Sequence, residues 1–538
     1  MEIVVVLAAL LLIISTLSYL GYPLLWNDEA DTAMFGRSIQ EHGYPKPKLG
    51  ANTLYHMPHP DLTLGVKESI DAFIPHGWAQ YYIAAAADKL TNLSDQLHIK
   101  TALLRLPFAL IGITGIFLLA LLITKVFASR KQKFIGAILF LTLVLLTPNI
   151  ALHLREVRYY PLVIFLIGYL SFLFYKIYIE EKVNTGLYKW LLVFALWLLY
   201  NTFAPVFFIF VATAAIWLFY LWLQDYLTSK NWKRSWIRQW PRWWPWLTSL
   251  ISGLPLLWLY ETFFIARVTA QQFNFGFSDY LDNIGAIITF LSQTGSLYLL
   301  IVTVAITLIL KFREHQVWNS AEKLFLFLCL LFAVYLLGIA RIPFLFERYF
   351  IELRLLILII ISLSIVINIQ QLNKIGSQSF NKIAYATMIG VLILLGVLLR
   401  WEYISGYWSQ LTNRYYGPTG YAVKYLKSVY QDPSDLIIAT NYEEQVYMYY
   451  LKSRVIVGYV GNNLAEDRGL SPDVIIYRRD WTGHEDIFTD YLEKDDYRVI
   501  SLPIMDYKYN NIAESCCHLY TSPLTRDYNK QLKIFLRQ

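Results

Sequence analysis

Long apolar stretches alternate with short charged segments along most of the chain. Runs of about 18–22 apolar residues, with the charges confined to the connections between them, are typical of transmembrane helices. The pattern predicts a polytopic α-helical membrane protein with about eleven spans. The apolar runs lie near residues 3–24, 103–124, 134–152, 160–179, 189–201, 204–224, 245–262, 284–310, 324–340, 350–370 and 383–400.

The pattern changes after residue 400. Short β-branched runs then alternate with helical stretches such as GYAVKYLKSVY, which is typical of an α/β arrangement. The sequence therefore predicts a transmembrane domain over residues 1–402, with a large first loop over 25–102, and a small extracytoplasmic α/β domain over 403–538. The expected strands lie in the segments DLIIAT, SRVIVGYV, PDVIIYRR and YRVISLP.

Composition and charge agree with a membrane protein. Of 538 residues, 57% are hydrophobic and only 16% are charged, whereas soluble proteins carry about 25%. The net charge of +7 comes largely from basic residues in three short loops, so it requires no nucleic acid. Because basic loops face the cytoplasm, we expect loops 125–133, 230–242 and 311–323 there.

This orientation places the first loop, the turns at 153–159 and 341–349, and the tail after residue 400 on the extracytoplasmic side. The first apolar run offers Glu2 and no basic residue before it, so we expect a retained anchor rather than a cleaved signal. No lumenal retention signal is visible at the C-terminus. We therefore expect a multi-pass protein of a cell (plasma) membrane.

Tryptophan recurs every fourth residue from Trp232 to Trp240, and arginine does so from Arg234 to Arg242. This spacing places the two residue types on opposite faces of a helix. We expect that helix to lie in the cytoplasmic headgroup region, with its basic face toward anionic lipid.

Three carboxylates follow the first apolar run, in the stretch WNDEAD. One interpretation is a helix that runs to about Gly43, with Asp28 as its cap and with Glu29 and Asp31 complementing the helix dipole. The other is functional, because more ionisable residues are expected at the same membrane face, where such residues are candidates for a site. They are His76, His153, Arg155, Glu156, Arg158, Arg341, Glu347 and Arg348.

The order of these residues resembles the glycosyltransferase C superfamily, in the branch of the protein O-mannosyltransferases and lipid A aminoarabinose transferases. The likeness covers roughly residues 1–400. The WWDYG signature of oligosaccharyltransferases is absent, which disfavours transfer of whole oligosaccharides to asparagine. The matching segments are Asp28-Glu29, IPHGWAQYY with His76, Arg105-Leu106-Pro107, Arg155-Glu156-Val157-Arg158-Tyr159-Tyr160 and Arg348-Tyr349-Phe350.

The resemblance implies a membrane glycosyltransferase that moves a hexosyl or pentosyl unit from a polyprenyl-phosphate carrier to a hydroxyl of a lipid, glycan or protein. An inverting displacement at the anomeric carbon needs one base for the incoming hydroxyl. Asp28 is the candidate base. Glu29 would orient Asp28 or hydrogen-bond the sugar or acceptor.

The leaving lipid phosphate requires fixed cations. Arg158 and Arg348 are the candidates, with His76 as a third, because arginine suits bidentate phosphate contact. The supporting residues are Arg155, Glu156 and Tyr159.

Two features of these supporting residues stay open. Glu156 either pairs with the neighbouring arginines or holds a divalent metal (Mg or Mn) that bridges protein and phosphate. We expect Tyr159 in the aromatic belt of the membrane. The cluster YHMPHPD offers a second candidate metal site, at His56, His59 and Asp61.

Other function classes remain open at this point. A lipid-linked sugar flippase or transporter would predict charged or broken helices near the membrane midplane, whereas the ionisable residues here lie at span ends. A polysaccharide polymerase or ligase would use the same leaving group. A structural membrane protein would carry the same apolar pattern.

Overall fold

The computed structural model describes residues 2–55, 65–180, 186–292, 295–314, 317–343, 345–374, 379–459, 464–479, 483–506 and 524–538. The chain forms two compact units, each built from segments that are distant in sequence. The helical unit comprises Met1–Thr16, Leu110–Leu154 and Tyr160–Trp408. The mixed unit comprises Leu17–Ala109, Arg155–Tyr159 and Ser409–Gln538. The boundaries of these two units differ from the predicted domain boundary at residue 402. That domain boundary stays a prediction.

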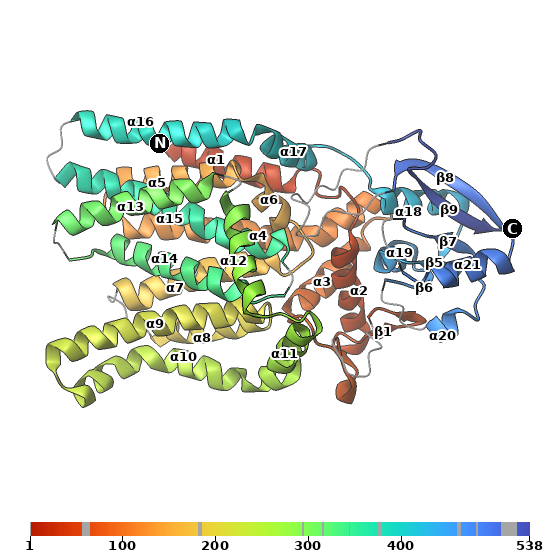
Figure 1. The fold of residues 1–538 in the computed structure, drawn as a ribbon, viewed down its shortest axis with the longest axis horizontal. Helices are drawn as coiled ribbons and strands as arrows, with labels where there is room; N and C mark the ends of the chain where they lie inside the picture. The colour runs from red at the N-terminus through yellow and green to blue at the C-terminus, as the bar shows by residue number, and fades with distance from the viewer. Residues whose placement is uncertain are drawn as a thin grey trace. The chain divides into compact units, whose positions relative to one another are not determined.

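The helical unit consists of apolar helices that run side by side (Figure 1). Its elements are α1 (Glu2–Leu17), most of α4 (Leu97–Val126), α5 (Arg130–Leu145), α6 (Pro148–Leu154), α7 (Tyr160–Phe174) with its π-helical extension η2 (Tyr175–Glu180), α8 (Gly186–Tyr200), α9 (Ala204–Ser229), α10 (Trp232–Tyr260), α11 (Thr262–Gln272), α12 (Phe277–Ser292), α13 (Ser296–Glu314), α14 (Ser320–Ile339), η3 (Glu347–Phe350), α15 (Ile351–Lys374), α16 (Ser379–Leu399) and the first part of α17 (Trp401–Thr412).

Helix α15 lies at the centre of this unit. It packs against α5, α13 and α14, and the apolar window of the segment Glu347–Lys374 is entirely buried. A helix that is apolar on every side is stable only when neighbours cover it all round. The uniform run of leucine and isoleucine in its sequence therefore explains its position.

Within the described residues, six helices are long and apolar enough to cross a membrane. Three pairs bent by 51° to 80° raise this number to nine if each pair is one span. The prediction of a multi-pass membrane protein is confirmed, whereas the number of about eleven is only partly supported. Helices α1 and α8 have 16 and 15 residues, and at 1.5 Å per residue they are shorter than the hydrocarbon core of about 30 Å.

Two predicted segments differ from the structure. The apolar run 284–310 is not one helix, because α12 ends at Ser292 and α13 begins at Ser296, next to Gly295 with φ of 70°. The segment with the tryptophan repeat is not a separate interfacial helix. It is the first part of α10, a continuous helix of 29 residues in which the Trp232 and Trp236 rings stack with centroids 6.3 Å apart.

The mixed unit combines helices with short strands. It contains α2 (Asn27–His42), the antiparallel pair β1 (Lys48–Leu49) and β2 (Asn52–Thr53), the antiparallel pair β3 (Val66–Lys67) and β4 (Ala72–Phe73), η1 (Glu68–Ile70), α3 (Ala79–Thr91), the start of α4, the end of α17, α18 (Pro418–Val429), η4 (Pro433–Asp435), β5 (Ile437–Thr440), α19 (Glu444–Leu451), β6 (Arg454–Val457), α20 (Leu464–Asp467), β7 (Val474–Ile476), α21 (Glu485–Lys494), β8 (Tyr497–Met505) and β9 (Gln531–Arg537).

The C-terminal strands form one mixed sheet in the order β6-β5-β7-β9-β8. Strands β5, β6 and β7 are parallel, and β9 is antiparallel to both β7 and β8. The four predicted strand segments are confirmed as β5 to β8, and β9 was not predicted. Helices that connect parallel strands lie on the faces of the sheet. Helix α19 packs with α18 and α2 in one apolar core, and α21 packs in a second apolar core.

Helix α2 is held closely against its neighbours. A Cβ atom on Gly36 would lie 2.9 Å from the backbone nitrogen of Ala85 in α3, so only glycine permits this approach. On another side, Arg37 donates a 3.0 Å hydrogen bond to the carbonyl of Tyr449 in α19. The first loop and the C-terminal segment are thus parts of one packed body.

Candidate functional site

The predicted helix after the first apolar run is α2, and it ends at Gly43 in the left-handed conformation (φ 83°). Its N-cap is Trp26, and Asn27 is its first residue, so the interpretation of Asp28 as the cap is wrong. Glu29 occupies the third helical position, where its Oε2 accepts the Trp26 N–H at 3.4 Å. The capping function therefore falls to Glu29, which leaves the Asp28 carboxylate for other contacts.

Glu29 also forms a buried ion pair in the mixed unit. Arg105 in α4 donates from Nε to Oε1 at 2.8 Å and from Nη2 to Oε2 at 2.5 Å. Glu29 is fully buried and Arg105 is 3% exposed. The remaining Arg105 nitrogen, Nη1, donates to the carbonyls of Leu20 and Pro23. Glu29 thus joins the start of α2 to α4, which fits an orienting role better than proton transfer.

The same carboxylate positions the segment Arg155–Tyr159. Glu29 Oε1 accepts the backbone N–H of Val157 at 3.0 Å. Arg155 donates to the carbonyls of Ser18 at 3.1 Å and Gln410 at 3.3 Å. These contacts fix the chain immediately before Arg158.

Arg158 contacts the carboxylate face of α2. Its Nη2 lies 3.4 Å from Asp28 Oδ2, and its Nη1 lies 3.7 Å from Asp31 Oδ2. Nη1 also donates to the carbonyl of Asp28 and to Thr32 Oγ1, both at 3.2 Å. The Asp28 side chain keeps 20% of its surface exposed. The geometry gives a partly accessible carboxylate beside a buried cation, and an incoming phosphate would compete with the two carboxylates for Arg158.

Asp31 is the most perturbed group at this site. Burial raises the pKa of Asp31 to about 8, Arg158 opposes this shift, and the negative charges of Asp28 and Glu444 add to it. Its Oδ1 is buried without a hydrogen bond from any described residue. A carboxyl group with a pKa near neutral pH can hold or release a proton under physiological conditions.

Aromatic rings surround the charged groups. The His76 ring lies 5.9 Å from the Tyr159 ring and 6.3 Å from Phe73, and the Arg158 guanidinium lies 5.6 Å from the Tyr159 ring. The expectation that Tyr159 belongs to an exposed aromatic belt is wrong, because it is only 1% exposed and packs inside the mixed unit. Burial also raises the pKa of Tyr55, and the charge of Asp31 adds to this shift.

The sequence suggests two candidate metal sites, one at Glu156 and one at His56, His59 and Asp61. In the part of the chain that the structure describes, no group of three or more His, Cys, Asp or Glu side chains could hold a metal ion. Glu156 is buried, and both interpretations of it stay predictions. The second suggested metal site, at His56, His59 and Asp61, lies outside the described residues, as do Cys516 and Cys517.

Arg348 belongs to the helical unit. It lies in η3, is 8% exposed, and its guanidinium carbon is 3.9 Å from the centroid of the Phe346 ring. The adjacent Glu347 accepts hydrogen bonds from Asn149 at 2.9 Å and from Arg354 at 3.2 Å. These contacts of Glu347 connect η3, which carries Arg348, to α6 and α15.

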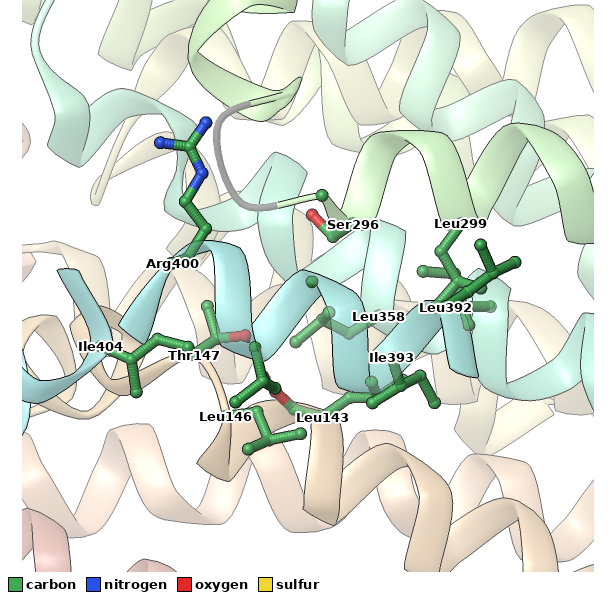
Figure 2. A pocket seen from close by; sticks show the side chains of 14 residues that line it. Leu143, Leu146, Thr147, Ser296, Leu299, Leu358, Leu392, Ile393, Arg400 and Ile404 are labelled. Atoms are coloured by element: carbon green, nitrogen blue, oxygen red, sulfur yellow. Dashed lines mark hydrogen bonds between the residues drawn. The ribbon is translucent and has the colours of Figure 1, made fainter. Parts of the chain in front are cut away.

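An apolar cavity of about 70 Å³ also lies in the helical unit (Figure 2). Leucine, isoleucine and valine side chains from α5, α13, α15 and α16 form most of its lining. Its polar lining residues are Thr147, Ser296 and Arg400. Such a lining fits hydrocarbon better than a sugar or a nucleotide.

Most of the predicted site residues therefore lie in one packed body. The mixed unit contains Asp28, Glu29, His76, Arg155, Glu156, Arg158 and Tyr159, whereas Arg348 is in the helical unit. The sequence pattern missed the importance of Asp31 and Glu444. A signal existed for Asp31, which stands one helical turn from Asp28 on α2. No signal existed for Glu444, because the sheet and helix that carry it are remote in sequence.

Comparison with solved structures identifies the fold. The structure of ArnT from Cupriavidus metallidurans in the apo state matches with a TM-score of 0.55 and 11% identity, over 99% of this chain and 97% of that chain. ArnT from the same organism bound to undecaprenyl phosphate matches with a TM-score of 0.52 and 10% identity, over the same shares. No protein-family model and no curated protein matches the sequence. The chain therefore has the fold of ArnT, a lipid A aminoarabinose transferase, and the predicted resemblance is confirmed for the fold.

Proposed function

We propose that the protein is an integral membrane glycosyltransferase that moves a sugar from a polyprenyl-phosphate carrier to a hydroxyl acceptor on the extracytoplasmic face. The observation that supports this most directly is the carboxylate of Asp28. It is 20% exposed and lies 3.4 Å from the Arg158 guanidinium, at the start of a helix fixed by the buried pair of Glu29 and Arg105, in a chain with the fold of ArnT.

The chemistry of the proposal is a single inverting displacement. The acceptor oxygen forms a bond to the anomeric carbon while the bond from that carbon to the phosphate oxygen breaks. The polyprenyl phosphate leaves with the electron pair, and the Asp28 carboxylate takes the proton of the hydroxyl. Arg158 fixes the position of Asp28, and the Asp31 carboxyl beside it supplies a second proton site.

A lipid carrier is supported by two observations. One of the ArnT structures with the same fold holds undecaprenyl phosphate. This chain also has an apolar cavity between membrane-spanning helices, with Arg400 in its lining (Figure 2). An isoprenoid segment fits such a lining, and arginine suits a phosphate. Arg158 and Arg348 stay the predicted ligands for the donor phosphate, with His76 as the third.

The described residues do not provide a metal cluster, and no step of this proposal depends on a metal. A divalent ion at Glu156 stays a prediction, which addition of a chelator to the transfer assay would test. Unchanged turnover in excess chelator would remove it.

The decisive experiment uses purified protein in nanodiscs with a panel of radiolabelled polyprenyl-phosphate sugars. Release of free polyprenyl phosphate is measured for wild type, for Asp28→Asn, and for Glu41→Gln as a control. Glu41 lies on the same helix with its side chain 58% exposed, so its substitution removes a carboxylate away from the site. Arg348→Ala is compared with Arg341→Ala, because Arg341 is a nearby exposed arginine.

We expect release with at least one donor, a loss of about a hundredfold or more in Asp28→Asn, and near wild-type release in Glu41→Gln. Tight donor binding without release, unchanged in Asp28→Asn, would instead favour a flippase. Products that grow by whole repeat units would favour a polymerase or ligase. Either result would overturn transfer of a single sugar.

A further inference from the structure

A second cavity lies in the mixed unit and has a polar lining. It measures about 170 Å³ and is lined by the β1–β2 pair, the first turn of α19, strand β6 and helix α20. A water molecule occupies about 30 Å³ in the liquid, so the space is large enough for several waters or one sugar ring. The first loop and the C-terminal segment each contribute one wall.

Glu444 is the more deeply buried of two buried acids that line this cavity, the other being Asp467. Glu444 is 3% exposed, and its Oε2 accepts no hydrogen bond from the described residues. A Cβ atom on Gly458 would lie 3.2 Å from Glu444 Oε1, and Gly458 has φ of 68°. Burial raises the pKa of Glu444. A desolvated carboxyl oxygen without a partner is costly unless an occupant of the cavity satisfies it.

The walls are already hydrogen-bonded, so they form a preformed frame. The Asn52 side chain donates to the carbonyl of Ser453 at 3.0 Å and accepts the N–H of Val455 at 2.8 Å. It thereby continues the edge of β6 as a neighbouring strand would. Asp467 Oδ2 accepts the N–H of Val457 at 3.0 Å. Little ordering of the protein is therefore required when a small molecule enters.

The charges of the lining indicate the class of occupant. Lys48 and Arg454 are the basic residues, and Glu444, Glu466 and Asp467 are the acidic ones. The acidic residues outnumber the basic ones, which disfavours a phosphate or another anion. Carboxylates, an amide and cations around a polar space are the partners that hydroxyl groups use, because each hydroxyl both donates and accepts.

We propose that this cavity binds a neutral sugar residue of the acceptor. The inference rests on the proposed function and extends it, since it makes the acceptor a glycan. Glu444 connects the two places, because its charge acts on Asp31 at the start of α2. A sugar bound here would hold the acceptor on the mixed unit. Glu444 would then contact the sugar in the cavity while its charge still acts on Asp31.

The test measures sugar binding without any donor. Methyl glycosides of common hexoses and pentoses are titrated into the full chain in nanodiscs, and saturation-transfer NMR reports binding. Glu444→Gln removes the charge of the buried acid. Ala51→Trp is the second variant, because Ala51 is exposed in the turn between β1 and β2 and lines the cavity. Glu493→Gln, exposed on α21, is the control.

We expect at least one glycoside to bind wild type and Glu493→Gln with the same dissociation constant. For both cavity variants, that dissociation constant should be about tenfold higher or more. With an active donor, Glu444→Gln should raise KM for the glycan acceptor more than it lowers kcat. Absence of binding to wild type, or binding to both cavity variants as tight as to wild type, would overturn the inference. If sugars bind at this cavity but no donor turns over, the proposed function fails while the cavity assignment stands.

Discussion

Removal of one partner of the buried pair of Glu29 and Arg105 is predicted to destabilise the mixed unit far more than removal of one partner of a surface ion pair. In Glu29→Gln the side chain keeps its size but loses its charge. The introduced amide oxygen can still accept one hydrogen bond from Arg105, but the amide NH2 is a donor and cannot accept from Arg105 Nη2. The Arg105 cation, 3% exposed, then loses one acceptor and the opposite charge that offsets its burial. Breaking one partner of a buried pair costs about 3–5 kcal/mol. The NH2 group also cannot accept the Trp26 N–H, which Glu29 Oε2 accepts at 3.4 Å.

A double-mutant cycle separates the pair from its surroundings. Glu29→Gln, Arg105→Met and the double variant are unfolded reversibly in mixed micelles, with the fluorescence of the 17 tryptophans as signal. We expect each single variant to lose about 3–5 kcal/mol and the double variant to lose less than the sum. The exposed pair of Arg130 and Glu2, with side chains 78% and 59% exposed, is the control. Arg130→Gln should cost less than about 1 kcal/mol.

Two results would contradict this prediction. One is that the losses of unfolding free energy in the single variants add up to the loss in the double variant. The other is a loss of unfolding free energy in Glu29→Gln no larger than in Arg130→Gln. Either result would mean that Arg105 finds other partners or water when the carboxylate is neutral. It would also remove the main support for the position of Arg158, because the backbone of its segment is anchored to the same carboxylate.

Three further predictions concern α2 and its neighbours. Burial raises the pKa of Asp31 to about 8 from an ordinary value of 3.8. Between these pH values the folded protein holds a proton that the unfolded chain releases, so the free energy of unfolding falls as pH rises. Asp31→Asn should lose this part of the decline, and unfolding midpoints that fall with pH in parallel with wild type would contradict the prediction. Arg158→Lys should lower kcat about tenfold or more with little change in melting temperature, because one ammonium cannot hold Asp28 and Thr32 together; full activity in the transfer assay would exclude a positioning role. Gly36→Ala should destabilise the protein by about 1–3 kcal/mol through its clash with α3, whereas Gly406→Ala, where the added Cβ meets nothing within 4 Å, should be neutral or stabilising, and equal unfolding free energies would count against the close packing.

The sequence alone determined the elements that depend on local pattern. Each apolar run corresponds to at least one helix, because a membrane span requires continuous apolar residues whatever lies beside it. The four β-branched segments are β5 to β8, and the helix from the WNDEAD stretch to Gly43 is α2. The order of the short polar motifs was sufficient to indicate the fold that the ArnT structures share.

Tertiary structure decided how these elements combine and which groups meet. The sequence pattern predicted Asp28 as a helix cap or a base. Only the packing of the first loop against α4 shows that the Glu29 carboxylate is hydrogen-bonded to Arg105 and to the Val157 N–H, whereas Asp28 lies beside Arg158. Likewise, the Asp31 pKa and the unsatisfied Glu444 oxygen arise from burial by segments from both ends of the chain. Periodicity is a local property of the chain, whereas desolvation and ion pairing depend on neighbours in space. The local pattern of a single sequence does not reveal which residues become neighbours in the folded protein.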